Sequence, residues 1–482
     1  MSGQQATLDE VFSPRSIAVV GASAARAKNV IFSRFAVECL INAGFPAVYP
    51  VNPNHTELFG LRCYASILDI PGPVDHVIIA IPANSALSVL DDCAAKGVKS
   101  VHIFTAGFSE SGEEDKALLE KALLEKAKAG GFRIIGPNCM GLYVPKEHVI
   151  VWPDMSPEPG SIAFISQSGG FAEDAAYYGI RRGLRFSKAV SYGNGIDIDE
   201  ADLLEYFAHD SETDIIAAYI EGIKDGGRFI NALKVAADKK PVVIYKSGFT
   251  PAGSRAVHGH TASIAGSADI FQTACRQMNG IQVDDLDQML DMLVALRFTS
   301  PMPQGTGVAV VGRGGGISVM ASDQIEAAGL HLPPIPPETK AELKQLLPNA
   351  GSIFGNPVDA NSLLSTGPIS STIQVLSRVP DINLFIYHLG FHPTSRWGDT
   401  RFASIVNLPS IADTLKKSQD LTGKPVIPVI RPPSELGGSD DFVAAQETLI
   451  SSGFPVFYSM TQASKALARL IAWNKNRTSA RS

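Results

Sequence analysis

The segment SIAVVGAS, residues 16–23, decides the fold of the first part of the chain. Its apolar residues run into a turn of small residues, which is typical of a buried strand that leads into a helix. The runs AVYPVN, HVIIAIP, SVHIFTAG and FRIIGPN follow before residue 142, and segments with a helical pattern separate most of them. Strands that alternate with helix-length segments predict parallel strands joined by crossover helices. We therefore expect a Rossmann-like sheet here.

Two proline-rich stretches divide the remainder of the chain. They read VWPDMSPEPG at residues 151–160 and TSPMPQGTG at residues 299–307. The segment IAFISQSGG (162–170) aligns without gaps with VAVVGRGGG (308–316), so the regions that they open are expected to be variants of one strand–turn–helix fold. At about 100–200 residues per domain, a length of 482 residues fits three domains. We predict them at 1–150, 151–300 and 301–482.

Composition excludes several classes of partner. Lys and Arg total 41 against 48 Asp and Glu, a net charge of −7, so no basic field attracts nucleic acid. The longest apolar runs have the length of strands, far below the ~20 residues of a membrane helix. No basic segment followed by an apolar one opens the chain, which favours a cytoplasmic location. The five cysteines are odd in number and well separated, as expected for reduced thiols.

The first strand ends at Gly21, Ala22 and Ser23. A turn of small residues at a helix N-terminus lets backbone N–H groups approach a phosphate. However, the full G-x-G-x-x-G pattern is missing, and Asn52 ends the second strand where a dinucleotide enzyme carries a ribose-binding acid. A nucleotide-like ligand is thus indicated but NAD is not, and a tight turn without a ligand is the alternative.

In the second region, the segment ISQSGG places Ser166, Ser168, Gly169 and Gly170 directly after a strand. Hydroxyls and bare amides at the start of a helix form a cradle for an anion. A nucleophile elbow would need a glycine two residues before Ser168, and Ser166 stands there. We therefore interpret this loop as a phosphate-binding loop.

The segment SRAVHGHTASIAGSADIF, residues 254–271, surrounds His258 and His260 with small residues. A neutral imidazole is a good nucleophile for a phosphoryl group, and a carboxylate on its other nitrogen stabilises the cation that forms. Glu221, at the end of the run IIAAYIEG, is our candidate for that carboxylate. From spacing alone, a hydrogen-bonded loop histidine remains the alternative. No metal site is predicted, because no carboxylate or thiol flanks the histidines at ligand spacing.

Ten motifs occur in one order along the chain: GAS with Lys28, VYPVNP, IAIPA, TAGFSESG, IIGPNCMG, ISQSGG, SYGN with Asp197, YIEG, GHTASIAGS and GNPVD. Together they resemble the α-subunit of the ADP-forming (NDP-forming) acyl-CoA synthetases, relatives of succinyl-CoA synthetase. The resemblance implies an α/β chain with a Rossmann-like CoA-binding domain. Two flavodoxin-like, succinyl-CoA synthetase-like α/β domains are expected to follow it.

The resemblance also implies functional residues. CoA is expected at strand ends of the first domain, on these residues: Gly21, Ser23, Lys28, Pro82, Thr105, Pro137 and Asn138. His260 falls on the family's phosphate-carrying histidine and Glu221 on the glutamate that orients it. The phosphate loop of the family falls on Ser166, Ser168 and Gly169.

Family members make an acyl phosphate from acyl-CoA and phosphate, pass the phosphoryl group to the histidine, and deliver it to ADP. The nucleotide, with Mg²⁺, binds an ATP-grasp domain, which we expect on a separate β-subunit, in a hetero-oligomer such as α2β2. The expected reaction converts a small carboxylic acid, CoA and ATP to acyl-CoA, ADP and phosphate. A CoA-binding acyltransferase and an acyl-CoA-sensing protein, both without phosphohistidine chemistry, are the alternatives.

Two segments depart from the family pattern, and a third segment offers a separate local clue. Gly259 stands where the family has serine, and Ala262 and Ser263 replace the small pair after the threonine. The third region opens with GRGGG, and its Arg313 either meets an anionic group or lies in solvent. The loop from Tyr387 to Arg401 either recognises a carboxylate or sulfonate, or is a solvated loop or subunit interface.

Overall fold

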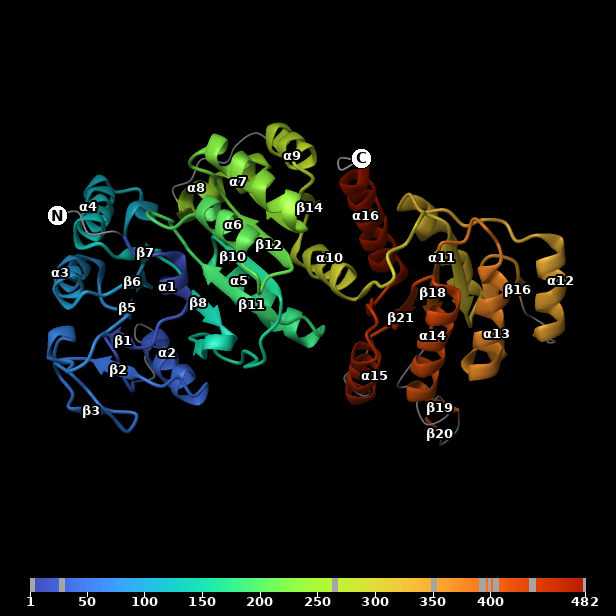
Figure 1. Ribbon diagram of the computed structural model, residues 1–482, viewed down its shortest axis with the longest axis horizontal. Helices are drawn as coiled ribbons and strands as arrows, with labels where there is room; N and C mark the ends of the chain where they lie inside the picture. The colour runs from blue at the N-terminus through green and yellow to red at the C-terminus, as the bar shows by residue number, and fades with distance from the viewer. Residues whose placement is uncertain are drawn as a thin grey trace. The chain divides into compact units, whose positions relative to one another are not determined.

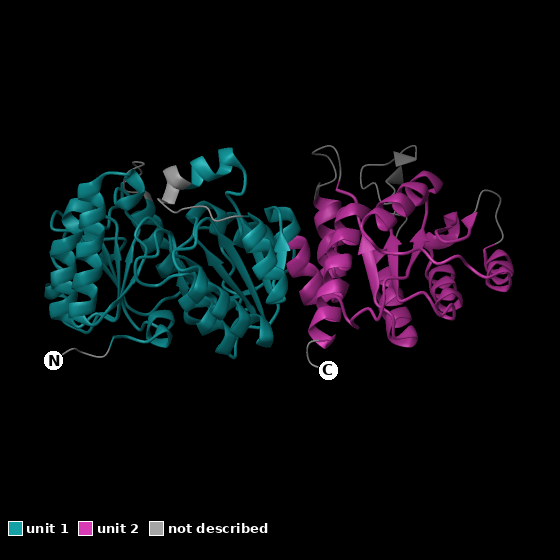
Figure 2. Cartoon of the chain, turned by 90° about the horizontal axis from the view of Figure 1, so that it is seen from above, with its two compact units in different colours: residues 1–289 teal, residues 290–482 magenta. Residues whose placement is uncertain are grey.

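The computed structural model describes residues 5–25, 31–261, 268–347, 353–389, 396–397, 400–401, 407–432 and 439–479. The chain forms two compact units, Met1–Met289 and Leu290–Ser482 (Figure 2). Unit 1 contains two large sheets and unit 2 contains one (Figure 1). Helices alternate with mostly parallel strands in all three, which confirms the predicted α/β class.

The first sheet is parallel, with strand order β2-β1-β5-β6-β7. Its strands are β1 (Ile17–Val20), β2 (Val48–Val51), β5 (His76–Ile79), β6 (Ser100–Ile103) and β7 (Arg133–Ile135). They coincide with the five apolar runs of the sequence. The other elements of this part are α1 (Leu8–Phe12), α2 (Ile31–Asn42), β3 (Glu57–Leu58), β4 (Leu61–Arg62), η1 (Ile67–Asp69), η2 (Ala83–Ser85), α3 (Ala86–Lys96), η3 (Ser109–Ser111) and α4 (Glu114–Gly130).

The helices of the first sheet end where glycine permits a left-handed backbone. Gly97 follows α3 with φ 73° and Gly131 follows α4 with φ 75°. Most side chains lack this conformation, so these glycines stop the helices and turn the chain into the next strand. The four residues of β1, β5 and β6 are all buried, as expected of parallel strands covered on both faces.

The second sheet has strand order β14-β13-β12-β10-β11-β8-β9. The strands are β8 (Gly141–Val144), β9 (Val149–Ile150), β10 (Ile162–Ser166), β11 (Phe186–Ser191), β12 (Ile215–Ile220), β13 (Val242–Lys246) and β14 (Ile281–Val283). The helices are η4 (Pro145–Glu147), α5 (Gly169–Arg181), α6 (Glu200–His209), α7 (Gly226–Lys239), α8 (Pro251–Thr261), α9 (Ala268–Gln277) and α10 (Leu286–Phe298). Strands β8 and β9 are antiparallel additions to this sheet. Both come before the proline-rich stretch at residues 151–160, so the second sheet begins ahead of that stretch.

Unit 2 contains a sheet with strand order β16-β17-β15-β18-β21. Its strands and the small hairpin are β15 (Val308–Gly312), β16 (Ile353–Phe354), β17 (Val358–Asp359), β18 (Leu384–His388), β19 (Arg396–Trp397), β20 (Thr400–Arg401) and β21 (Val426–Val429). Its helices are α11 (Gly315–Ala327), α12 (Pro337–Leu346), η5 (Asn361–Leu364), α13 (Thr366–Ser377), α14 (Leu408–Thr422), α15 (Ser439–Ser451) and α16 (Met460–Ser479). Strands β10 and β15 each run into a glycine-rich turn and a helix, as their aligned sequences predict. Among the described residues, no helix combines the length and the apolar character that a membrane crossing requires.

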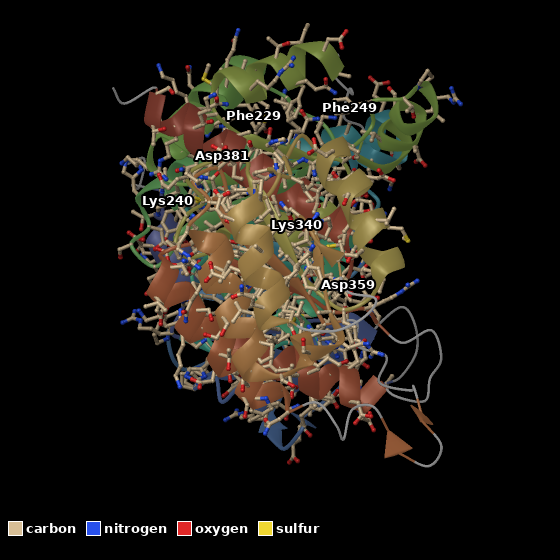
Figure 3. The ribbon with its side chains drawn as sticks, turned by 90° about the vertical axis from the view of Figure 1, so that its right-hand side faces the viewer. Phe229, Lys240, Phe249, Lys340, Asp359 and Asp381 are labelled. Carbon is tan, nitrogen blue, oxygen red and sulfur yellow. The ribbon has the colours of Figure 1, made fainter. Side chains whose placement is uncertain are left out.

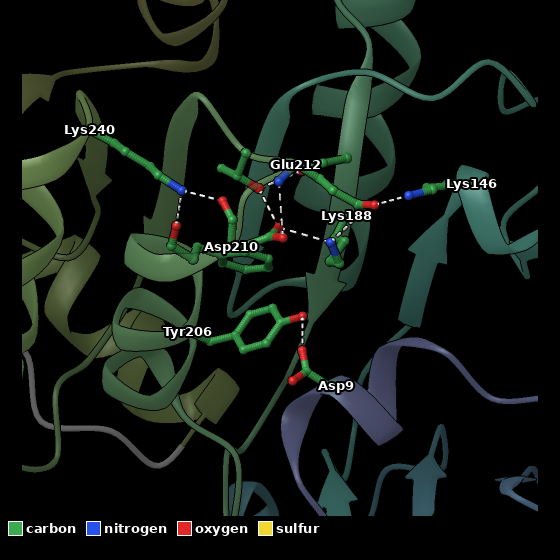
Figure 4. A network of polar contacts seen from close by, with 10 residues as sticks. Asp9, Lys146, Lys188, Tyr206, Asp210, Glu212 and Lys240 are labelled. Carbon is green, nitrogen blue, oxygen red and sulfur yellow. Dashed lines mark hydrogen bonds and ion pairs between the residues drawn. The ribbon is translucent and has the colours of Figure 1, made fainter.

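A buried ion network stabilises the second sheet around Lys188 of β11 (Figure 4). The ammonium group lies 2.9 Å from Asp210 and 2.8 Å from Glu212, and the Lys188 side chain is 5% exposed. Burial alone would raise the pKa of Asp210, but hydrogen bonds from Lys188 and Thr213 outweigh it and hold the pKa below its ordinary value. Tyr206 of α6 also donates to Asp9 of α1, 3.0 Å away.

We expect Lys188→Met to reduce the free energy of unfolding by about 3–5 kcal/mol, because it leaves the buried Asp210 carboxylate without its cation, whereas Glu212 keeps Lys146. Lys126→Met removes a more exposed partner of Asp91 and should cost below about 1 kcal/mol. Urea denaturation measures both. Because the folded pKa of Asp210 is lowered, the wild-type contribution is present above the ordinary Asp pKa and is lost as the pH falls. Equal losses in the two variants would contradict this assignment.

Candidate active site

The predicted phosphate loop and Glu221 lie at the topological switch point of the second sheet. From β10 the chain crosses to β11 on one side, while β12, β13 and β14 lie on the other. Ligands of open α/β sheets bind in the crevice that such a reversal leaves at the carboxyl ends of the strands. Ser166 ends β10, and Glu221 directly follows β12. The fold therefore brings together two predicted site residues that are 55 positions apart in sequence.

Gln167 connects the ends of these two strands. Its side-chain oxygen accepts hydrogen bonds from the backbone N–H groups of Glu221 at 2.7 Å and Gly222 at 2.9 Å. The side chain is buried, with the residue 3% exposed. This contact fixes the distance between the phosphate loop and the beginning of the loop that carries Glu221.

The loop after β10 has the geometry of an anion cradle. The Ser166 hydroxyl donates to the Ser168 carbonyl at 2.6 Å, and the Ser168 hydroxyl caps α5 by accepting from Phe171 N–H. Gly169 is close to Met140, whose Cγ would lie 2.6 Å from an added Cβ, whereas Gly170 is exposed and borders open space. The first N–H groups of a helix have no partners within the helix, and its dipole favours negative charge there. The N-terminus of α5 is thus suited to a phosphoryl group.

Glu221 is buried and held by its neighbours on β12 and β13. The Tyr219 hydroxyl lies 3.1 Å from the Glu221 carboxylate and also 3.1 Å from the Ser247 hydroxyl. Burial, followed by the charge of Glu221, raises the pKa of Tyr219, so this phenol remains a hydrogen-bond donor. A buried, oriented carboxylate at this position can stabilise an imidazolium, as the sequence analysis expects of Glu221.

Lys246, at the end of β13, places an ammonium group beside Glu221. It donates to the Glu221 carbonyl at 2.7 Å and to the Ser247 carbonyl at 2.5 Å. The ring centroid of Phe249 lies 5.1 Å from Nζ, and the lysine is 3% exposed. Burial lowers the pKa of Lys246 to about 8, although the charge of Glu221 acts in the opposite direction.

A second buried carboxyl group follows strand β11, the neighbour of β10 on its other side. Glu200 begins α6 and is buried next to Tyr192, which follows β11. Burial raises the pKa of Glu200 to about 7, and burial together with the charge of Glu200 raises that of Tyr192. The charge of Glu221 also acts on Tyr192, so these groups belong to one electrostatic environment. Ionisable groups with such shifted pKa values gather at functional sites.

The predicted CoA residues share one edge of the first sheet. Gly21, Pro82, Thr105 and Pro137 follow four adjacent strands, in the order β1, β5, β6 and β7. The Thr105 hydroxyl donates to the Ile81 carbonyl at 2.6 Å, and Asn138 N–H donates to the Thr105 carbonyl at 3.0 Å. Lys28 lies outside the described residues.

The turn after β1 requires glycine at position 21. Its φ is 85°, and an added Cβ would lie 2.6 Å from the Ala80 carbonyl oxygen. Ser23 accepts a hydrogen bond from Ala25 N–H at 3.1 Å, and Asn52 donates to the Ala22 carbonyl at 2.8 Å. Asn52 thus supports the turn itself, which explains why no ribose-binding acid stands there.

The segment with His258 and His260 was expected to be a loop, and the structure corrects this. Residues Pro251–Thr261 form α8, which packs against η3, the turn after β6 in the first sheet. The side chains of both histidines lie outside the described residues, so the contact between His260 and Glu221 stays a prediction.

In unit 2, Arg313, whose partner the sequence left open, donates from Nε to the Asn361 side-chain oxygen at 2.8 Å. Asp359, labelled in Figure 3, accepts from Gly314 N–H at 2.6 Å, and His388 is buried at the end of β18. Burial lowers the pKa of His388 to about 4. His392 and most of the Tyr387–Arg401 loop lie outside the described residues.

The two sheets of unit 1 carry two different kinds of candidate ligand site. One sheet offers a glycine turn and four strand ends to a nucleotide-like ligand. The other offers an anion cradle with a buried carboxylate and ammonium group. Within the described residues, no cluster of three or more His, Cys, Asp or Glu side chains could hold a metal ion. This combination defines a class of α/β proteins that bind a nucleotide-like ligand on one sheet and an anion such as phosphate on the other.

Comparisons with known proteins identify the family. The CoA binding domain model matches residues 15–145, and the "Succinyl-CoA ligase like flavodoxin domain" model matches residues 159–296. The α-subunit of ADP-forming acetate–CoA ligase II from Pyrococcus furiosus is 40% identical, over 79% of this chain and 81% of that protein. ADP-forming acetate–CoA ligase I from Archaeoglobus fulgidus is 33% identical over 97% of this chain, which spans 64% of that longer protein.

A solved structure covers nearly the whole chain. It is the dinucleotide-forming acetyl-coenzyme A synthetase 1 from Candidatus Korarchaeum cryptofilum in complex with phosphate and ADP, with 30% identity, a TM-score of 0.80 and 98% coverage of both chains. The protein belongs to the family of ADP-forming acyl-CoA synthetase α-subunits, which are acid–thiol ligases. The resemblance stated from sequence is therefore confirmed, and nothing in the comparisons supports the acyltransferase or sensor alternatives.

Sequence reasoning missed Gln167, Lys246, Tyr192 and Glu200 as site residues. A signal for Lys246 was present, because a lysine that ends the apolar run PVVIY is out of place in a buried strand. For Gln167 the signal was its position between the two serines of the phosphate loop. Glu200 carried no such signal, since it follows Asp199 in an ordinary helix N-terminus.

We expect Lys246→Met to lower the rate of CoA-thioester synthesis at least tenfold, because the site loses a cation beside Glu221. Wild-type activity should fall above pH 8 as the ammonium group loses its proton, and the variant should lack this limb. Since the folded pKa of Lys246 lies below the ordinary value, its contribution to stability rises with pH in the same window, so unfolding would not explain the fall. Lys234→Met, on an exposed face of α7, is the control. An unchanged high-pH limb in Lys246→Met would refute this role.

Proposed function

We propose that the chain works with a separate ATP-grasp β-subunit and converts a small carboxylic acid, CoA and ATP to acyl-CoA, ADP and phosphate. Similarity to the α-subunit of a two-subunit ligase supports the separate partner. So does the longer A. fulgidus relative, one third of which lies beyond the match with this chain. The nucleotide and Mg²⁺ belong on the partner, and α2β2 is the proposed stoichiometry. The reduced cysteines are consistent with a cytoplasmic location.

The observation that carries the mechanism is the pairing of an anion cradle with Glu221 across the switch point. In the proposed reaction, His260 bonds to the γ-phosphoryl group of ATP as the bond to the departing ADP breaks. At the N-terminus of α5, the carboxylate of the acid then takes this phosphoryl group, the bond to His260 breaks, and an acyl phosphate forms. Ser166 and Ser168 shape the loop, while Gly169 and Gly170 leave backbone N–H groups accessible. The Glu221 carboxylate stabilises the imidazolium character of the phosphohistidine. Each helix-terminus interaction is worth only ~0.3–2 kcal/mol, so several donors have to converge.

The CoA end of the reaction belongs to the first sheet. Gly21, Ser23 and Lys28 would hold the phosphates of CoA, because backbone amides and an ammonium group suit these anions. The strand-end residues Thr105 and Asn138 would border the arm that carries the thiol, with Pro82 and Pro137 as apolar walls. The loops of the two sheets meet at Gly193, where an added Cβ would lie 2.2 Å from the Asn138 carbonyl oxygen. The thiol and the phosphoryl group can thus be brought to one place.

We expect His260→Asn to abolish phosphorylation of this chain, because the nucleophilic nitrogen is lost. The protein, its ATP-grasp partner and Mg²⁺ are incubated with ATP labelled at the γ-phosphate. Wild type should acquire acid-labile, alkali-stable label, and His258→Asn, two residues away in the same helix, should retain it within about twofold.

Label on His260→Asn, or unlabelled wild type in a pair that synthesises thioester, would refute the phosphohistidine. Thioester synthesis by His260→Asn at the wild-type rate would show that the ligase works without a phosphohistidine. The substrate is then found by presenting a series of carboxylic acids to the active pair. Native mass measurement of the assembled pair tests the stoichiometry.

A further inference from the structure

The buried side-chain amide of Asn194 is one of the links between the first sheet and the second sheet. Asn194, in the loop after β11, is 2% exposed. Its Nδ2 donates to Glu110 at 2.7 Å and to Glu120 at 2.8 Å, both in the CoA-binding part. Carboxylates accept only, so these contacts fix which end of the amide faces the first sheet. Its oxygen, also buried, has no hydrogen-bond partner in the part of the chain that the structure describes.

On the CoA side, the amide reaches the loop that follows Thr105. One oxygen of Glu110 accepts from Gly107 N–H at 2.6 Å and from Phe108 N–H at 3.2 Å, while the other takes the bond from Asn194. Glu120 in turn accepts from the Ser109 hydroxyl at 2.8 Å. The shape of this loop, which includes η3, therefore depends on the same carboxylates that bind Asn194.

On the phosphate side, the backbone of the same residue is tied to the switch point. Lys224 donates to the Asn194 carbonyl at 2.7 Å, and Lys224 follows Glu221 by three residues. Tyr192 N–H donates to the Ser166 carbonyl at 2.9 Å. Asn194 N–H donates to the Pro137 carbonyl at 3.0 Å, which ties the loop to a predicted CoA residue.

We propose that Asn194 is a positioning residue that holds the loop after Thr105 in register with the phosphate loop, so that the CoA thiol meets the acyl phosphate. This rests on the proposed function. In the step concerned, the CoA sulfur forms a bond to the acyl carbon, the bond from that carbon to the phosphate oxygen breaks, and phosphate leaves with the thiol proton. A misplacement of about 1 Å can slow such a step ~100-fold.

Two substitutions separate this role from a general structural one. Asn194→Asp has nearly the same shape, but it replaces a donor by a third carboxylate beside Glu110 and Glu120. In the double variant Glu110→Gln, Asn194→Asp, the glutamine nitrogen can donate to the new carboxylate while its oxygen still accepts from Gly107 N–H. The hydrogen bond between positions 110 and 194 is thus restored with donor and acceptor exchanged. The Glu120 carboxylate still lies beside the new carboxylate at position 194.

The experiment uses the complete enzyme with its β-subunit and follows three signals. They are labelled phosphohistidine formed from ATP, acyl hydroxamate trapped by hydroxylamine without CoA, and acyl-CoA formed with CoA. We expect Asn194→Asp to keep the first two within about twofold and to lose at least tenfold in kcat for acyl-CoA. The double variant should regain at least threefold. Asn231→Asp, on the exposed face of α7, should match wild type.

Each other outcome decides against the proposal. Acyl-CoA synthesis by Asn194→Asp within twofold of wild type would show that the amide has no positioning role. A parallel loss of all three signals, without recovery in the double variant, would make it a folding residue. If the wild-type enzyme forms acyl-CoA but no phosphohistidine, the proposed function is refuted instead. The wild-type enzyme is therefore measured first, before any variant.

Discussion

The hydrogen bonds of Gln167 are the constraint on which the candidate active site depends. At the switch point, β10 and β12 lie side by side, but the connections that leave them run in opposite directions. The backbone pairing extends one residue past β10, where Gln167 N–H donates to the Tyr219 carbonyl at 3.1 Å. Beyond that pair, the Gln167 side chain sets the spacing of the loops by accepting two N–H groups at the beginning of the neighbouring loop. The anion cradle and the Glu221 carboxylate are thereby held at one separation, as pre-organised electrostatic catalysis requires.

Around this constraint, the protein keeps charges that burial disfavours. Lys246 and Glu200 are each at most 5% exposed. Burial lowers the pKa of Lys246 and raises the pKa of Glu200, so it favours the neutral form of both side chains. A stable core would be easier to build from apolar side chains of the same volume. A site that receives and releases a multiply charged phosphoryl group has a reason to retain them. The Lys188 network shows the contrasting case, in which buried charges are paired directly and serve the fold.

Much of the fold could be predicted from the sequence, because strands and turns are indicated by residues that are close together in the chain. Apolar runs gave the strands of the first sheet, and Gly21 marked the turn after β1. Two sites at carboxyl ends follow from parallel topology without knowledge of the contacts. The partners of the site residues could not be predicted in this way. Gln167 and Glu221 are 54 residues apart, and Asn194 and Glu110 are 84 apart, so only the assembled structure joins them.

The helix that carries His260 also differed from the expectation for a physical reason. The sequence PAGSRAVHGHT of α8 contains two glycines and few good helix formers, so local propensity favoured a loop. Packing against η3 overrides that preference. The two glycines each lower the stability of the helix by about 0.5–1 kcal/mol relative to alanine, so packing rather than propensity holds α8 in place.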